Sequence, residues 1–158
     1  MRHWALSSLI LLGLAIGLAG CKEDPCEDTV CLNGVCASGI CICDVGYEDE
    51  ECRTPSRDKF LHSIWYNNRT CSGISDLLQS RIEAGQGGIA EIRIFNLDSI
   101  PDTLHANVRG DTAWIPLQVH GLEYIEGIGV YSNGGVVFEY ERVQTGGERS
   151  DCIAYFSH

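Results

Sequence analysis

Cysteines are the residues of this chain whose number and spacing most clearly carry chemistry. Of the nine, six fall between Cys26 and Cys52 with the spacing C-x4-C-x4-C-x4-C-x-C-x8-C. This segment is too short and too polar to bury a core, so disulfides must hold it folded. Cys71 and Cys152 remain as a further natural pair. Thiols at this density would stay reduced in a cytosol, so the pattern predicts an oxidising compartment.

The first twenty residues have the pattern of a signal peptide. A basic start at Arg2 is followed by an apolar run over residues 9–18 and by the small residues Ala19 and Gly20. The run is too short to cross a bilayer comfortably, and no stop-transfer pattern flanks it. We therefore predict a signal peptide over residues 1–20.

Residues 18–21, Leu-Ala-Gly-Cys, resemble the lipobox of bacterial lipoproteins. The resemblance implies that Cys21 is lipidated with acyl chains such as palmitate, and residues 21–25 then form a lipidated tether to the membrane. Lys22-Glu23-Asp24 resembles a signal that sends some lipoproteins to the outside of the outer membrane in Gram-negative bacteria. The expected location is therefore the outer membrane of a Gram-negative bacterium, exposed at the cell surface. An ordinary charged linker is the alternative for residues 22–24.

The second half of the cysteine-rich segment resembles the EGF-like domain signature. Cys41-Ile42-Cys43 is followed by the pair Gly46-Tyr47 and then by Cys52, which defines an EGF-like module over residues 26–52. Spacing alone cannot choose among fifteen pairings of six cysteines. The resemblance implies the bridges Cys26–Cys36, Cys31–Cys41 and Cys43–Cys52. Asn33-Gly34 favours a hairpin turn with positive φ between the second and third cysteines.

Calcium binding is a weak option for this module. Glu23 and Asp24 precede the first cysteine, where calcium-binding EGF-like domains place acidic residues. The interval between Cys36 and Cys41 offers no Asn or Asp side chain, and calcium requires six or more oxygen ligands. We therefore expect a rigid spacer without a metal, which lifts the next domain off the membrane.

No residue pattern predicts catalysis. The sequence has no nucleophile elbow, glycine-rich phosphate loop or zinc spacing. His62, His105 and His120 stand alone, and a triad of His105, Asp102 and a serine is a combination that arises in any chain. With every cysteine assigned, thiol catalysis is excluded too. We predict a non-catalytic protein with no cofactor.

Residues 60–158 read as a β-domain, which a short linker at residues 53–59 separates from the EGF-like module. Alternation is clear where Ala90, Ile92 and Ile94 share one face. The β-prone runs are Phe60 to Asn67, Ile89 to Leu97, Thr103 to Val108, Trp114 to Val119, Glu123 to Tyr131, Val136 to Val143 and Asp151 to Phe156. The run from Ile74 to Ala84 fits a helix or a strand, and we favour a strand because the neighbouring segments are strands.

Turn signals organise these runs into a meander. Asn133-Gly134-Gly135 and Thr145-Gly146-Gly147 predict hairpins, and Pro116 predicts an edge or a bulge. The expected fold class is mainly β: a small disulfide-rich EGF-like module followed by an antiparallel β-sandwich or barrel of about eight strands. The hairpin rhythm resembles the short lipocalin-like domains of bacterial lipoproteins.

Four Asp-(Ser/Thr)-aliphatic triplets resemble an O-glycosylation sequon of exported proteins in some Gram-negative bacteria. Their possible glycosylation sites are Thr29, Ser99, Thr103 and Thr112. The alternative is ordinary Asx-turn chemistry, which also favours Asp before Ser or Thr at strand ends.

Charge and architecture limit the partners. The chain has 22 acidic against 11 basic side chains, a net charge of −11, so we predict no nucleic acid partner. The preferred function is a membrane-anchored binding or adhesion module that contacts an extracellular protein, glycan or small ligand through loops at one end of the β-domain. The alternatives are a structural coat and a carrier that holds an apolar ligand within a barrel. The carrier would use Trp65, Phe95, Trp114, Phe138 and Tyr140.

Overall fold

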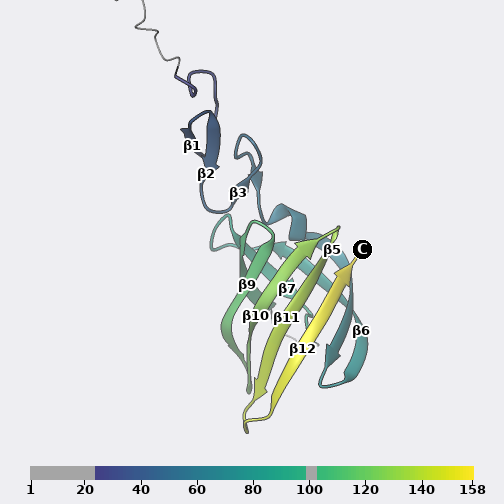
Figure 1. The fold of residues 1–158 in the computed structure, drawn as a ribbon. Coiled ribbons are helices and arrows are strands. Elements are labelled where there is room, and N and C mark those ends of the chain that lie inside the picture. The colour runs from purple at the N-terminus through teal and green to yellow at the C-terminus, as the bar shows by residue number, and fades with distance from the viewer. Residues whose placement is uncertain (1–23, 99–102) are drawn as a thin grey trace, which may run out of the picture.

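The computed structural model describes residues 24–98 and 103–158, and almost every element in it is a β-strand. In these two ranges no helix is long and apolar enough to span a membrane. The signal peptide, Cys21, Glu23, Ser99 and Asp102 lie outside the described residues. Figure 1 shows a small N-terminal module next to one end of a larger barrel.

Disulfides and short hairpins build the N-terminal module. Its strands are β1 (Gly34–Ala37), β2 (Ile40–Cys43), β3 (Tyr47–Glu48) and β4 (Thr54–Pro55), and the 3-10 helix η1 (Asp58–Phe60) leads from it into the barrel. The structure contains the bridges Cys26–Cys36, Cys31–Cys41, Cys43–Cys52 and Cys71–Cys152. The first three are the pairs that the EGF-like resemblance implies, and the fourth is the pair that the cysteine count left over.

The tight turn of the module lies elsewhere than predicted. Ser38 and Gly39 have positive φ and join β1 to β2, whereas Asn33 and Gly34 do not. Gly34 instead lies so close to β2 that an added Cβ would be 2.4 Å from the carbonyl oxygen of Ile42. The glycine is therefore required by a close backbone approach and not by a turn.

Eight antiparallel strands close into a barrel, which decides between the sandwich and the barrel. The strands are β5 (His62–Cys71), β6 (Ile74–Ala84), β7 (Glu91–Phe95), β8 (Thr103–Arg109), β9 (Thr112–His120), β10 (Glu123–Ser132), β11 (Gly135–Gln144) and β12 (Arg149–Ser157). Each strand pairs with the next along the chain, and β12 closes the barrel against β5. The ambiguous segment Ile74–Ala84 is a strand, as predicted.

Local signals in the sequence explain several of these strands. Asn133 and Gly134 have positive φ and form the two-residue turn between β10 and β11, as their residue types require. The pairing of β9 with β10 shifts by one residue at the position of Pro116, which therefore lies in a bulge. Ile92 and Ile94 alternate into the core along β7.

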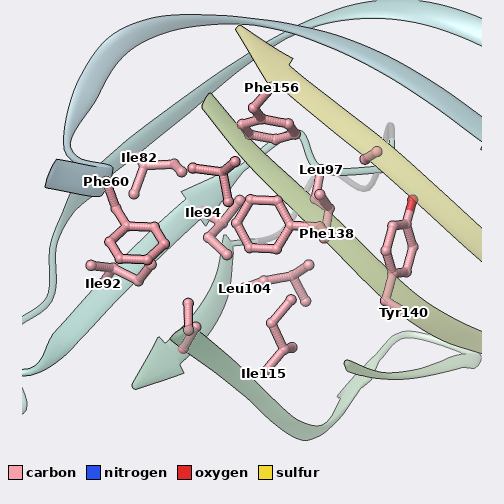
Figure 2. Packing of buried hydrophobic residues seen from close by; sticks show 14 of the residues in the cluster. Phe60, Ile82, Ile92, Ile94, Leu97, Leu104, Ile115, Phe138, Tyr140 and Phe156 are labelled. Carbon is pink, nitrogen blue, oxygen red and sulfur yellow. The ribbon is translucent and has the colours of Figure 1, made fainter. Parts of the chain in front are cut away.

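Large side chains fill the inside of the barrel. Figure 2 shows Phe138 at the centre of the labelled cluster, with other rings and branched side chains around it. The ring centroids of Phe138 and Phe156 are 5.0 Å apart, and those of Trp65 and Phe156 are 6.1 Å apart. Phe60 from η1 is fully buried at the end nearest the EGF-like module. The barrel interior is thus a packed core.

The segment expected to be a linker is built into the fold. Ser56 is buried and its N–H donates to the carbonyl oxygen of Gly46. Arg57 donates to the carbonyl oxygen of Gly88 at 2.7 Å in the loop before β7. Lys59 contacts Glu48 of the module and Asp111 of the barrel, both at 2.7 Å. These contacts hold the EGF-like module against one end of the barrel, which we call the module end.

Candidate functional site

A groove of about 680 Å³ crosses the outer face of the barrel over β10, β11, β12 and β5. It is open to solvent and extends to the turn between β5 and β6. We call it the outer groove, and its lining residues are Thr70, Ser72, Gly73, Glu126, Gly127, Ile128, Glu139, Tyr140, Glu141, Asp151, Cys152 and Ile153.

Strand register places an acidic row across the groove. Glu126 of β10 lies opposite Glu141 of β11, and Glu141 lies opposite Asp151 of β12. Like charges directly opposite each other on neighbouring strands destabilise a sheet. Within the described residues, the cation that pairs with this row is Arg149, 2.7 Å from Glu141. The row therefore keeps a local excess of negative charge.

An apolar row lies beside the acidic one. Two residues further along the same strands, Trp114 lies opposite Ile128, Ile128 opposite Glu139, and Glu139 opposite Ile153. The large apolar side chains of Trp114 and Ile128 are 43% and 40% exposed. Glu139 adds a fourth carboxylate next to the acidic row. The outer face thus combines exposed apolar surface with an excess of negative charge.

A second apolar row follows on the side nearer the module end. Val130 lies opposite Val137, and Val137 lies opposite Tyr155. Val130 and Tyr155 are 42% and 51% exposed. Apolar side chains therefore continue from the groove along β10, β11 and β12.

The disulfide of the barrel supports the floor of the groove. Cys152 lies opposite Cys71, and their bridge joins β12 to β5 where the barrel closes. The Tyr140 hydroxyl is 3.8 Å from the Cys71 sulfur on the inner side. Burial raises the pKa of Tyr140, although the nearby Arg69 and Arg142 oppose that shift. Tyr140 is therefore a neutral part of the core at physiological pH.

A buried ion cluster lies at the barrel end opposite the module, which we call the far end. The Asp98 carboxylate is fully buried and contacts Arg69 of β5 and Arg142 of β11. These two arginines also contact Asp76 and Glu123, respectively. The cluster ties the segment after β7 to β5, β6, β10 and β11, and two guanidinium groups compensate the buried carboxylate.

The same region contains the one grouping of metal-type ligands among the described residues. The side chains of Cys71, Cys152 and Asp98 lie within 4.8 Å of one another. The two sulfurs are bonded to each other, and both Arg69 and Arg142 already face the carboxylate. This arrangement is structural, and we assign no metal to it.

The predicted modification sites are scattered over the described structure. The Thr29 hydroxyl donates to the carbonyl oxygen of Pro25 at 3.3 Å, and Thr103 and Thr112 are half-buried at the starts of β8 and β9. Asp24, one half of the weak calcium option, accepts a hydrogen bond from the N–H of Cys26 at 2.9 Å. The structure therefore does not gather these residues into one site.

Three of the histidines contact other side chains at two separate places. Nδ1 of His105 is 2.6 Å from Oε1 of Glu91. Hydrogen bonds from His105 and from the backbone of Gly87 lower the pKa of Glu91. The rings of His62 and His158 lie 4.6 Å apart next to Trp65.

Two of the five aromatic residues expected inside a carrier barrel lie outside it. Trp65, Phe138 and Tyr140 are in the core, whereas Trp114 is exposed and Phe95 packs beneath the guanidinium of Arg81 at 4.1 Å. Both follow directly from strand alternation, because each is adjacent to an inward-facing isoleucine. The carrier alternative, which would use all five residues, thus has three of them inside the barrel.

Sequence reasoning missed the outer groove, although one signal for it was present. The Asn133-Gly134 turn pairs Ser132 with Gly135 and so fixes the register of the hairpin. Counting back along both strands from this turn places Glu126 opposite Glu141. The position of Asp151 depends on the register between β11 and β12. The connection between these strands is longer than a two-residue turn, so the sequence alone does not determine that register.

The fold and these surface features define a class of protein: a small disulfide-rich module followed by a closed eight-stranded antiparallel barrel. No protein-family model and no curated protein matches this chain.

Proposed function

We propose that this protein is a non-catalytic surface lipoprotein whose barrel is a binding or adhesion module. The lipobox-like residues 18–21 support an anchor of acyl chains on Cys21. The lipoprotein resemblance and the Lys22-Glu23-Asp24 sequence support placement at the outer membrane of a Gram-negative bacterium, facing outward. Four disulfides fit an oxidising compartment. The partner is an extracellular protein, glycan or small ligand.

The packed interior of the barrel is the observation that best supports a binding role over a carrier role. Trp65, Phe138 and Phe156 lie in the core of the barrel, and the ring of Phe156 packs against the other two. A carrier needs an interior cavity of several hundred cubic ångströms, and these rings take that place. The outer groove instead provides a concave surface with apolar and charged side chains. Binding on the outside of the barrel is therefore the better supported role.

The EGF-like module acts in this proposal as a rigid spacer. Lys59 connects Glu48 of the module to Asp111 of the barrel, and Gly46 lies so close to Ile89 that an added Cβ would be 2.6 Å from its side chain. A fixed junction keeps the outer groove at a constant orientation to the anchor. The loops at the module end are partly covered, which favours the outer face over those loops as the binding surface.

Site-specific photocrosslinking on living cells tests this function. A photoreactive residue at Ile128, within the outer groove, is expected to form a covalent adduct with a partner on irradiation. The matched control is the same residue at Leu77, an exposed apolar position of β6 outside the groove. Adducts from neither position, or equal adducts from both, would contradict a specific binding role for this face.

A further inference from the structure

We propose that the outer groove binds a basic polypeptide segment that combines lysine or arginine with apolar side chains. This inference rests on the proposed binding function and names the chemistry of the partner. It follows from the juxtaposition of an acidic row and an apolar row on one exposed face.

Charge is the first argument for a basic partner. Glu126, Glu141 and Asp151 lie side by side on three neighbouring strands, and Glu139 lies in the next row. Arg149 alone among the described residues pairs with the acidic row. Neutral or acidic partners would leave this repulsion in place, whereas a basic segment would relieve it.

Dimensions favour an extended segment. Strands lie about 4.8 Å apart, so the acidic row spans about 10 Å from Glu126 to Asp151. Side chains at positions i and i+2 of an extended peptide are about 7 Å apart. Two basic residues with one residue between them therefore fit above the three carboxylates.

Apolar contacts supply the second part of the recognition. Ile128 and Ile153 line the groove itself, and Trp114 borders it directly opposite Ile128. An apolar side chain of the segment would cover surface that is now exposed. Apolar anchors at the centre with charges at the rim are typical of protein interfaces.

Other occupants fit this face less well. Anionic lipid headgroups would be repelled by the acidic row. A second copy of this chain would bring a like-charged face against it, given the net charge of −11. A divalent cation would satisfy the carboxylates but would leave the apolar row uncovered. These alternatives are outcomes of the experiment below.

The test is a titration of the full lipidated protein in detergent with three octapeptides. The Lys-Val peptide carries Lys at positions 1 and 3, Val at positions 5 and 7 and Gly elsewhere, so that all four side chains share one face of an extended chain. The Lys-Gly peptide has Gly in place of Val, and the Glu-Val peptide has Glu in place of Lys. We expect saturable binding of the Lys-Val peptide alone, with a change in the fluorescence of Trp114 and weakening at higher salt. Equal binding of the Lys-Gly peptide would contradict apolar recognition, and binding of the Glu-Val peptide would contradict the charge argument.

Matched charge variants locate the binding. The triple variant E126Q, E141Q and D151N should weaken the Lys-Val peptide about tenfold. The control variant E27Q, D28N and E50Q removes the same charge from exposed positions of the EGF-like module and should leave affinity nearly unchanged. Thermal unfolding of each variant checks that the barrel is folded. Equal weakening by both variants would reduce the effect to overall charge and overturn the inference.

Two further arms exclude the alternatives. Calcium chloride that saturates the groove and displaces the peptide would replace the inference with a cation site. Binding of vesicles of anionic lipid through the groove would replace it with a membrane contact. If all peptides fail while the Ile128 photocrosslink still captures a partner on cells, the basic-segment inference is wrong and the proposed function stands.

Discussion

At the scale of single residues, Asp49 shows how one carboxylate organises the last loop of the EGF-like module. Its side chain accepts hydrogen bonds from the N–H groups of Glu51 at 2.8 Å, Arg53 at 3.1 Å and Thr54 at 2.9 Å, and from the Thr54 hydroxyl at 2.5 Å. The Thr54 hydroxyl contributes most to lowering the pKa of Asp49 to about 2, followed by the backbone of Arg53. Asp49 also has a positive φ of 77°, which aspartate tolerates better than most residues.

The D49N variant tests this role through pH. Because the folded pKa of about 2 is below the ordinary value of 3.8, the ionised Asp49 stabilises the fold fully above about pH 4. That stabilisation is lost as pH falls through about 2. Thermal unfolding should therefore show a less stable D49N variant at pH 5, with the difference shrinking towards pH 2. E50Q, a neighbouring exposed acid, serves as the control. A difference that is constant with pH would contradict the assignment.

Another residue-scale prediction concerns glycosylation of Thr29, Ser99, Thr103 and Thr112. If the triplets are used, the intact mass of the native protein should exceed the sum of peptide and acyl groups. Replacing all four hydroxyl residues with alanine should remove the excess. If the native mass equals that of the peptide plus its acyl groups, the triplets are not glycosylated and serve only in turns and at strand ends. Asp98, the aspartate of the Ser99 triplet, already has a structural role because it is buried in an ion cluster.

At the scale of elements, β10 is shaped by glycines that face the core. An added Cβ at Gly129 would be 2.3 Å from the ring of Phe138, and one at Gly127 would be 2.5 Å from the Cβ of Tyr140. The two glycines therefore let the rings of β11 lie across the backbone of β10. Glycine within a strand usually weakens it, and here aromatic packing occupies the space.

The G129A variant should destabilise the barrel by about 1–3 kcal/mol, because the ring of Phe138 has to move within a packed core. Denaturant unfolding measures the change. V130A, at an exposed neighbour on the same strand, should change the free energy of unfolding by less than about 0.5 kcal/mol. Equal changes in the free energy of unfolding for the two variants would show that the core near Phe138 can accommodate an added methyl group.

At the scale of the whole molecule, the junction between module and barrel determines how the proposed binding face is oriented. Lys59 is largely buried, which disfavours its charge, but hydrogen bonds to Asp111 and Glu48 more than compensate and raise the pKa of Lys59. The ammonium group therefore stays charged at physiological pH and connects both parts. Together with the contacts of Arg57 and Gly46, this connection leads us to expect that the two parts form one rigid unit.

The K59M variant tests that rigidity. Partly exposed ion pairs contribute about 0.2–1 kcal/mol each, so unfolding should become easier by about 1 kcal/mol. Residual dipolar couplings should fit a single alignment for module and barrel in the wild type and two alignments in K59M. R53M, which removes an exposed pair with Glu51, is the control and should retain a single alignment. A single alignment in all three proteins would show that Lys59 is not needed for the junction.

Much of the fold could be predicted from the sequence because its signals are local. The resemblance to the EGF-like signature implied the three bridges of the module, and turn pairs such as Asn133-Gly134 led to the meander. The full length of β5 was missed because its inward positions include Asn67 and Arg69, whose polar side chains hide the alternation. Closure of the barrel depends on the pairing of β12 with β5, a contact between distant segments that no local pattern encodes.

The proposal that this protein is a surface-exposed lipoprotein can be tested on intact cells. Cells are labelled with radioactive palmitate and their surface is then digested with a protease. We expect label in the wild-type protein and no label in a C21A variant. We also expect loss of the labelled full-length chain when protease is added outside the cells. A wild-type protein that takes up no palmitate, or one that is labelled but fully protected from external protease while a known surface protein is digested, would contradict the proposal.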